Sequence, residues 1–425
     1  MLEHDRPITR AYVLHPDLKT DRTRRAADPA LEEAVSLAAA LPDLQVVGAE
    51  VVRLPKLLPG TLFGKGKIAE LKDRMKAEEV ELVLIDGHVT PVQQRNLEKA
   101  WDVKLLDRTG LILEIFSDRA RTAEGVLQVE MAALSYQRTR LVRAWTHLER
   151  QRGGLGFVGG PGETQIEADR RAIDMQLQAL KRQLEKVVKT RTLHRAARAK
   201  VPYPIVALVG YTNAGKSTLF NRLTGADVFA KDMLFATLDP TMRQIELPEG
   251  DKIIMSDTVG FISDLPTELV AAFRATLEEV LDADLIVHVR DISHPQTEEQ
   301  SKDVMAILTS LGVADDAPLL EVWNKIDRLP SDDHDGIVTQ AARTEDIFAI
   351  SAITGEGLDP LLDAISEVLK DPRTADQLTL GFGAGKARAW LFDQGVVTGE
   401  RQTEDGYVID VFWTQTQASR FGKLD

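Results

Sequence analysis

The hydrophobic positions of the first 125 residues alternate between short apolar runs and helical spacing. The short runs are rich in Val, Leu and Ile, and they predict strands at 11–14, 44–52, 81–86 and 103–106. The stretches between them predict helices at 29–41, 67–79 and 91–101. Two of these helices have a start signal, because Asp28 precedes Pro29 and Thr90 precedes Pro91. Strands that alternate with helices predict a small α/β domain with a mainly parallel sheet.

The next stretch, residues 126–200, has the apolar spacing of two long helices. Apolar residues recur at intervals of four and three in two series, interrupted once where Arg138 takes a seam position: Leu127, Met131, Leu134, Leu141, Trp145 and Leu148, then Ile173, Leu177, Leu180, Leu184 and Val187. Between the two series, residues 152–162 contain six glycines in eleven positions, which no helix tolerates. The pattern predicts an antiparallel helical hairpin with a Gly-rich tip.

Alternating strands and helices return after the hairpin, and the chain ends with a short mixed segment that has one clear strand at 407–413. We therefore expect four domains: an N-terminal α/β domain at 1–125, the basic helical hairpin at 126–200, a second α/β domain at 201–372 and a small α+β domain at 373–425.

Composition limits the class of protein. The chain has 425 residues, of which 44% are hydrophobic and 28% charged, as in ordinary globular proteins. It has no Cys, which excludes disulfides and cysteine-based metal or redox chemistry. No apolar stretch approaches the ~20 residues of a membrane span, and the first ten residues lack the apolar core of a signal peptide. We expect a cytoplasmic protein without a membrane span.

Charge is distributed unevenly along the chain. The net charge of the chain is −14. Residues 131–200 nevertheless carry 15 basic and 6 acidic side chains, while residues 201–372 carry 12 basic and 31 acidic side chains. Basic residues on a helix often do no more than keep its exposed face in contact with water. Here a flexible Gly-rich tip lies beside them, which favours RNA binding. We expect the RNA contacts among the basic and glycine residues around the tip: Arg138, Arg143, Arg150, Arg152, Gly153, Gly154, Gly156, Arg170 and Arg171.

The strongest chemical signal is a phosphate-binding loop that follows the apolar run 205–209 and opens a helical stretch. It matches the pattern G-x-x-x-x-G-K followed by S or T, and it consists of Gly210, Tyr211, Thr212, Asn213, Ala214, Gly215, Lys216 and Ser217. Its backbone N–H groups and the helix N-terminus are suited to phosphate oxygens. We expect Lys216 to neutralise the β- and γ-phosphates and the Ser217 hydroxyl to bind Mg²⁺.

Two further motifs complete the phosphate side of the predicted site. In the DTVG motif after the strand 252–255, Asp257 can hold Mg²⁺ through water and the Gly260 N–H can contact the γ-phosphate. Between the motifs, Thr237 can bring a hydroxyl to Mg²⁺. The expected contacts here are Phe235, Ala236, Thr237, Leu238, Asp239, Asp257, Thr258, Val259 and Gly260.

Two later motifs select the base. In NKID, the Asp327 carboxylate can accept both N1–H and N2–H of guanine, a donor pair that adenine lacks, and in SAI the Ala352 N–H can donate to guanine O6. The expected contacts are Asn324, Lys325, Ile326, Asp327, Ser351, Ala352 and Ile353. Together the five motifs predict a P-loop GTPase domain at 201–372.

The hydrolysis machinery looks incomplete. Phe261 follows DTVG, where several GTPases have a Gln that positions water, and an apolar side chain cannot do this. Asn213 is either a turn residue or a polar group that helps to place a cation. With Lys216, Thr237, Gly260 and Asn213 as catalytic residues, we predict slow hydrolysis that a partner or K⁺ stimulates.

The chain resembles the HflX-type ribosome-associated GTPases, of the Obg–HflX group of P-loop translation-factor-like GTPases. The resemblance rests on GTLFGKGK at 60–67, the glycine tip at 153–165, the phosphate loop with Asn213 and FATLD at 235–239. It implies a GTPase with Mg²⁺ that binds the large ribosomal subunit and its RNA, and that splits or rescues stalled ribosomes or matures the subunit under stress. The alternative is a GTPase switch with another RNA or protein partner, such as an RNA-modification complex.

Two further expectations concern partners. Some members of the resembled family are credited with an adenine-nucleotide activity in the N-terminal domain, so the loop 60–67 is a candidate second phosphate-binding loop for ATP. Because it lacks the full phosphate-loop pattern, a tight turn or a contact with RNA backbone is the favoured interpretation. Besides GTP and GDP, the expected ligands are Mg²⁺ and K⁺ at the GTP site, and ATP is a further candidate at the N-terminal domain. The chain is expected to act as a monomer.

Overall fold

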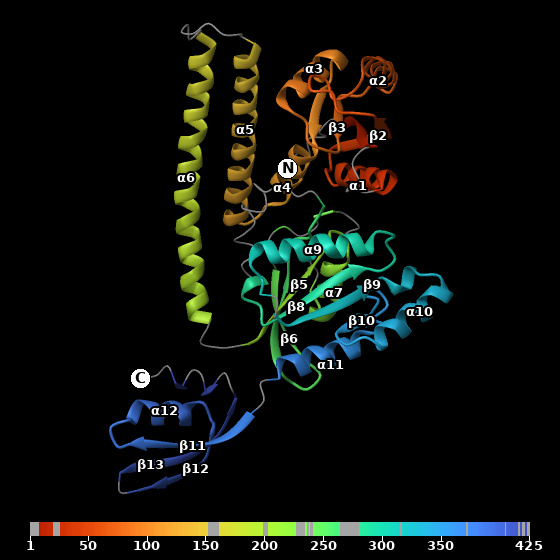
Figure 1. The fold of residues 1–425 in the computed structure, drawn as a ribbon. Helices are drawn as coiled ribbons and strands as arrows, with labels where there is room; N and C mark the ends of the chain where they lie inside the picture. The colour runs from red at the N-terminus through yellow and green to blue at the C-terminus, as the bar shows by residue number, and fades with distance from the viewer. Residues whose placement is uncertain are drawn as a thin grey trace, which may run out of the picture. The chain divides into compact units, whose positions relative to one another are not determined.

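A computed structural model describes most of the chain in two compact units, Met1–Leu362 and Asp363–Asp425 (Figure 1). It covers residues 8–19, 26–151, 161–198, 203–226, 234–235, 238, 241–263, 280–314, 317–370, 373–403, 405–414, 417–418 and 421–422. At 142–151, 161–166, 190–198 and 373 the description is limited to the backbone. Within these ranges, no helix is both long enough and apolar enough to cross a membrane.

The N-terminal domain is an α/β fold on a four-stranded sheet. The strands are β1 (Thr9–Leu18), β2 (Leu44–Leu54), β3 (Leu82–Ile85) and β4 (Lys104–Asp107). The helices are α1 (Ala27–Ala39), α2 (Lys65–Ala77), α3 (Pro91–Trp101) and α4 (Arg108–Arg119). The strand order is β2-β1-β3-β4 and every pair is parallel, which confirms the predicted parallel sheet.

Local signals explain some helix starts and not others. Thr90 caps α3 in a capping box with Gln93, as its place before Pro91 predicts. The start signal at Asp28 is wrong, because α1 begins at Ala27 and Asp28 lies in the first helical turn, where its charge favours the helix dipole. The sequence patterns did not predict α4, which begins directly after β4 with Asp107 as its capping residue.

The two long helices of the hairpin are α5 (Ala123–Gln151) and α6 (Pro161–Arg198). They lie side by side in Figure 1, and α5 also contacts α3 and α4. The seam position of Arg138 is explained by an ion pair, because its Nε lies 2.9 Å from a carboxylate oxygen of Asp174 on α6. The last two residues of the Gly-rich stretch belong to α6, and 152–160 lie outside the described residues.

The P-loop domain has a six-stranded sheet in the order β10-β9-β8-β5-β7-β6, parallel except for β6 against β7. Its strands are β5 (Ile205–Gly210), β6 (Thr241–Glu246), β7 (Lys252–Asp257), β8 (Leu285–Asp291), β9 (Leu319–Asn324) and β10 (Ile347–Ala349). Its helices are α7 (Lys216–Thr224), α9 (Thr297–Leu311), α10 (Ser331–Ala342) and α11 (Leu358–Leu369). Four of the five motifs follow β5, β7, β9 and β10, so they meet at the carboxyl ends of parallel strands, where such folds bind ligands.

One hydrophobic core runs from the N-terminal domain into the P-loop domain. Its buried members include Ile112 and Phe116 of α4 together with Phe235, Val259 and Phe261. The rings of Phe116 and Phe235 meet edge to face, with centroids 4.6 Å apart and planes at 79°. The N-terminal domain therefore packs directly against the loops that carry the predicted phosphate contacts.

The C-terminal unit has its own small core. Strands β11 (Arg373–Gly381), β12 (Val397–Gln402) and β13 (Gly406–Thr414) form an antiparallel sheet in the order β11-β13-β12, with α12 (Gly385–Asp393) between β11 and β12 in the chain. The core consists of Leu391, Val396, Ile409, Val411 and Trp413. This is the short α+β fold that the sequence predicted.

Candidate functional site

The phosphate loop connects β5 to α7, and two of its glycines are required by close packing. Gly210 has a φ of +152°, and a Cβ there would lie 2.1 Å from the carbonyl oxygen of Val289 on β8. Gly215 has a φ of +94°, and a Cβ there would lie 2.2 Å from Nδ2 of Asn324. A larger residue at either position would strain the backbone; it would clash with the backbone of β8 at Gly210 and with the Asn324 side chain at Gly215.

Lys216 is the first residue of α7, and it is 5% exposed. Its Nζ donates to the carbonyl oxygens of Gly210 at 3.1 Å and Tyr211 at 2.9 Å. Burial lowers the pKa of Lys216 to about 8; Asp257 opposes this shift and Lys325 adds to it. A triphosphate would favour the charged ammonium, so this lysine is electrostatically matched to an anionic ligand.

Ser217 and Asp257 bring together the oxygen ligands that Mg²⁺ prefers. The Ser217 hydroxyl donates to the Asp257 carboxylate at 2.7 Å, and Asp257 is fully buried at the end of β7. Oxygen ligands from a hydroxyl and a carboxylate fit this ion, which keeps several of its own waters. The other predicted ligand, Thr237, and its neighbours Ala236 and Asp239 lie outside the described residues.

The DTVG loop lies directly against the phosphate loop. The Thr258 hydroxyl donates to the Leu208 carbonyl at 2.6 Å, which fixes the start of the loop on β5. A Cβ on Gly260 would lie 2.8 Å from Cα of Thr212 and 3.0 Å from Nζ of Lys216. Only glycine fits this contact, so the Gly260 backbone is held next to Lys216.

The side chain of Phe261 points into the core, and its backbone pairs with the phosphate loop. It is 1% exposed. Its N–H donates to the Gly210 carbonyl at 3.1 Å, and its carbonyl accepts from the Thr212 N–H at 2.7 Å. Phe235 and Leu238, predicted to contact GTP, are also buried in this core.

The base-selecting motifs are tied to the phosphate loop through Asn324. Its Nδ2 donates to the Ala214 carbonyl at 2.8 Å, and its Oδ1 accepts from the Ala352 N–H at 3.0 Å. That N–H was predicted to reach guanine O6, and in the structure it is engaged by Asn324. The Asp327 carboxylate accepts from the Ser351 hydroxyl at 2.6 Å, which orients it.

Two supporting residues were missed by sequence reasoning. Arg222 of α7 donates to the carbonyls of Ile353 and Thr354, both at 3.1 Å, and thus holds the SAI loop. Asp291, at the end of β8, lies 2.7 Å from Nζ of Lys325. Neither residue belongs to a motif, so only the packing of strands and helices brings them to the site.

The predicted RNA contacts are described in part. Arg170 and Arg171 are exposed on α6, whereas Arg138 pairs with Asp174. Arg143 and Arg150 lie on α5, where only the backbone is described. Arg152, Gly153, Gly154 and Gly156 lie outside the described residues.

The loop 60–67 consists of the end of a tight turn at 58–62 and the start of α2. Leu58 and Leu62 exchange backbone hydrogen bonds at 3.1 and 2.9 Å, and α2 begins at Lys65. Lys67 lies 3.1 Å from a carboxylate oxygen of Glu50 and 2.9 Å from one of Glu70. The lysine that would neutralise a second phosphate group is already paired with two carboxylates, which favours the tight-turn interpretation.

Comparisons with known proteins agree with this fold along nearly the whole chain. Family models match at 28–117 (GTP-binding GTPase N-terminal), 119–198 (GTP-binding GTPase middle region), 205–325 (50S ribosome-binding GTPase) and 336–424 (HflX C-terminal domain). A GTPase HflX from Magnetococcus marinus is 48% identical over 405 residues, which cover 95% of this chain and 92% of that protein. A GTPase HflX from Escherichia coli is 45% identical over 350 residues, which cover 82% of this chain and 82% of that protein.

A solved GTP-binding protein from Sulfolobus solfataricus, in complex with GDP, is 23% identical, with a TM-score of 0.46, and the match covers 85% of this chain and 98% of that one. The sequence relatives decide the family. The chain belongs to the HflX family of GTPases, and its P-loop domain binds and hydrolyses GTP.

Proposed function

We propose that GTP lies along the loops that follow β5, β7, β9 and β10, with its phosphates at 210–217 and its guanine between Asp327 and Ala352. Asn324 supports this proposal, because it hydrogen-bonds both the phosphate loop and the SAI loop. The hydroxyls of Ser217 and Thr237 would hold Mg²⁺, and Asp257 would hold it through water. The ion supplies positive charge to the phosphate oxygens, while Lys216 neutralises the β- and γ-phosphates and the Gly260 N–H contacts the γ-phosphate.

Intrinsic hydrolysis is slow in this proposal. Phe261 is buried, so its side chain does not position the attacking water. Asn213 is exposed with a φ of +60°, a left-handed conformation that Asn tolerates, which suits a turn residue and leaves its amide at the surface. K⁺ near Asn213, or a bound partner, would supply the missing charge. Equal hydrolysis rates in K⁺ and in Na⁺ would contradict the proposed stimulation by K⁺.

The proposed partner is the large ribosomal subunit with its RNA, approached by the hairpin. The observation that carries this is the charge of +9 over residues 131–200, with Arg170, Arg171, Lys181 and Arg182 exposed on α6. The family model over 205–325 is described as a 50S ribosome-binding GTPase, which points to the same subunit. In this role the protein, a cytoplasmic monomer, would split or rescue stalled ribosomes or mature the subunit.

Sedimentation with purified ribosomal subunits tests this function. The full chain should pellet with the large subunit in the presence of a non-hydrolysable GTP analogue, and less with GDP or without nucleotide. The small subunit serves as the control for non-specific RNA binding, because it too is rich in RNA. Equal pelleting with both subunits would indicate non-specific RNA binding, and absence from both would point to another RNA or protein partner.

A further inference from the structure

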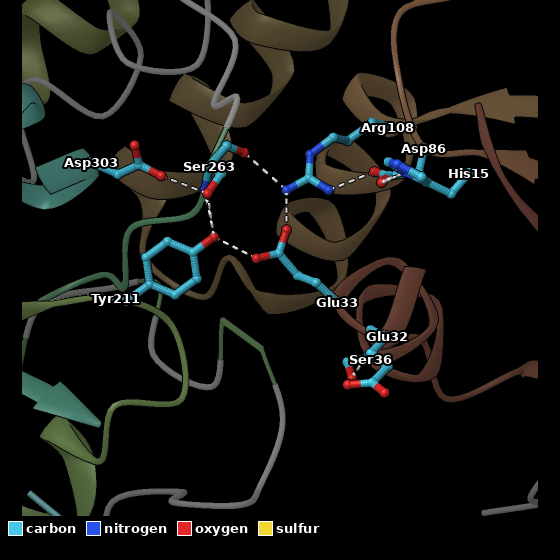
Figure 2. A network of polar contacts seen from close by, with 9 residues as sticks. All are labelled: His15, Glu32, Glu33, Ser36, Asp86, Arg108, Tyr211, Ser263 and Asp303. Carbon is cyan, nitrogen blue, oxygen red and sulfur yellow. Dashed lines mark hydrogen bonds and ion pairs between the residues drawn. The ribbon is translucent and has the colours of Figure 1, made fainter. Parts of the chain in front are cut away.

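Four residues from the two domains surround Ser263, and we call the five together the junction: Tyr211, Ser263, Glu33, Arg108 and Asp303 (Figure 2). Tyr211 belongs to the phosphate loop, and Ser263 lies three residues after Gly260. Glu33 is on α1 and Arg108 begins α4, so both come from the N-terminal domain, while Asp303 is on α9.

Every polar group of Ser263 has a partner at the junction. Its N–H donates to the Tyr211 hydroxyl at 2.8 Å, and its own hydroxyl donates to Asp303 at 2.6 Å. Its carbonyl accepts from the Arg108 guanidinium at 2.9 Å. The Tyr211 hydroxyl in turn donates to Glu33. Ser263 is therefore held by the phosphate loop, by α9 and by the N-terminal domain.

The charges at the junction are buried and paired. Arg108 is 4% exposed, and its guanidinium lies 2.6 Å from Glu33 and 2.6 Å from Asp86. Burial opposes its charge, but the two carboxylates outweigh this and raise the pKa of Arg108. Burial and the charge of Glu33 raise the pKa of Tyr211, so its hydroxyl keeps the proton that it donates.

The junction lies at one end of the backbone segment that carries the γ-phosphate contact. The other end is fixed on β5 by Thr258, and the middle is paired to the phosphate loop through Phe261. Gly260 lies between these points, packed against Lys216. Ser263 and Phe261 both contact the phosphate loop, so loss of the Ser263 contacts would loosen the Phe261 pairing and shift the adjacent Gly260 N–H relative to the γ-phosphate. The α- and β-phosphates contact the backbone of the phosphate loop instead.

We propose that Glu33 and Arg108 are positioning residues for GTP hydrolysis: they hold Ser263, and through it Gly260, at the γ-phosphate. The N-terminal domain is thereby part of the machinery that distinguishes GTP from GDP. The inference rests on the proposed place of the γ-phosphate at Gly260 and does not depend on the ribosomal partner.

Glu33→Gln in the full chain tests the inference, because it removes the charge and keeps the size. Glu32→Gln is the matched control: Glu32 is the neighbouring, exposed residue of α1, away from the junction in Figure 2. Arg108 is left unchanged, because its removal would leave Glu33 and Asp86 buried without their counter-charge. Tyr211→Phe is the second variant, which removes the hydroxyl and keeps the ring.

The measurements are the affinities for GDP and for a non-hydrolysable GTP analogue, the single-turnover rate at saturating GTP, and the unfolding midpoint. We expect Glu33→Gln and Tyr211→Phe to weaken analogue binding about five- to tenfold, since charge-assisted hydrogen bonds are lost. The affinity for GDP should change by less than about twofold. The single-turnover rate should fall about as much as the affinity for the GTP analogue does. Glu32→Gln should leave both nucleotide affinities and the single-turnover rate unchanged.

Two results would overturn the inference. Equal weakening of both nucleotides, with a lower unfolding midpoint, would show a general effect on folding. Unchanged affinities for both nucleotides would show that the junction does not reach the γ-phosphate. Failure of the unaltered chain to bind GDP, or undiminished binding after Lys216→Ala, would instead contradict the proposed nucleotide site.

Discussion

The side chain of Asn324 donates a hydrogen bond to the backbone carbonyl of Ala214 over 2.8 Å, which joins a base-selecting motif to the phosphate loop. Asn324→Ala would remove this bond and leave buried backbone groups unsatisfied, at a cost of about 1–3 kcal/mol for each. We expect GTP and GDP affinities to fall together by about 10- to 100-fold. Equilibrium binding of a fluorescent nucleotide measures this.

The matched control is Asn96→Ala. Asn96 also donates from its amide to a backbone carbonyl, that of Gly60, at 2.8 Å, but in the N-terminal domain. It should lower the unfolding midpoint and leave nucleotide affinity unchanged. Similar nucleotide affinities for the two variants would contradict the role given to Asn324.

Asp327→Asn should change the base that the protein prefers. The carboxylate, oriented by Ser351 at 2.6 Å, can accept from N1–H and from the 2-amino group of guanine. An amide can accept from N1–H but would donate toward position 2, which suits the carbonyl that xanthine has there. We expect GDP affinity to fall by about 100-fold or more and xanthosine diphosphate affinity to rise. Asp332→Asn, on the exposed start of α10, should change neither affinity.

Nucleotide affinity should depend on pH through Lys216. Burial lowers its pKa to about 8, so its ammonium loses its proton as the pH rises through that value. Binding of phosphates then requires proton uptake, because the bound state favours the charged form. We expect the Kd for GDP to be nearly constant between about pH 6.5 and 7, just above the phosphate pKa of about 6, and to rise about fourfold between about pH 7 and 8.5.

Calorimetry in buffers of different ionisation enthalpy provides the independent measurement for Lys216. Near pH 8 about half a proton should be taken up for each nucleotide bound, since the free lysine is then half protonated. No proton uptake at this pH would mean that Lys216 is already fully charged before the nucleotide binds.

The motif residues could be predicted because their chemistry is local. The phosphate loop needs its glycines, Lys216 and Ser217 within a few positions, and it follows a strand that is readable as an apolar run. The helix α4 was missed because it is buried on several sides: Leu111, Ile112 and Leu113 are all buried in succession, which leaves no helical period to detect.

Contacts between distant segments could not be predicted from the sequence. The bond from Arg108 to Ser263 joins residues 155 positions apart, and no spacing rule covers such a pair. Tyr136 illustrates the same limit. Its position in the basic hairpin makes it a candidate for stacking on RNA bases. Its hydroxyl instead donates to Asp107 of the N-terminal domain and accepts from Arg140 on the same helix, α5.

Charge reversal on α6 should weaken RNA binding without disturbing the nucleotide site. We expect the double variant Arg170→Glu/Arg171→Glu to bind the large subunit about tenfold more weakly and to lower the slope of log affinity against log salt by about 1.5. Lys386→Glu/Arg401→Glu changes the charge equally at exposed positions of the C-terminal unit. Equal losses for the two double variants would show an effect of net charge alone, and GDP affinity should be the same in both.

Phe261→Gln should not accelerate hydrolysis, although it installs the residue type that positions water in several GTPases. The Phe261 side chain is 1% exposed within the core that also holds Phe116 and Phe235. An amide there loses apolar contacts and its hydrogen bonds to water, which costs about 2–5 kcal/mol. We expect a lower unfolding midpoint and a single-turnover rate that is unchanged or reduced.

Phe261→Leu is the comparison for this site. It keeps an apolar side chain, so it should lower the midpoint less, and its hydrolysis rate should stay near that of the unaltered chain. A several-fold faster rate in Phe261→Gln, with the midpoint unchanged, would mean that the loop turns this side chain toward the phosphates. In that case the DTVG loop would have two conformations, and Phe261 would be buried in the core in only one of them. Slow hydrolysis would then be a property of the conformation with Phe261 buried.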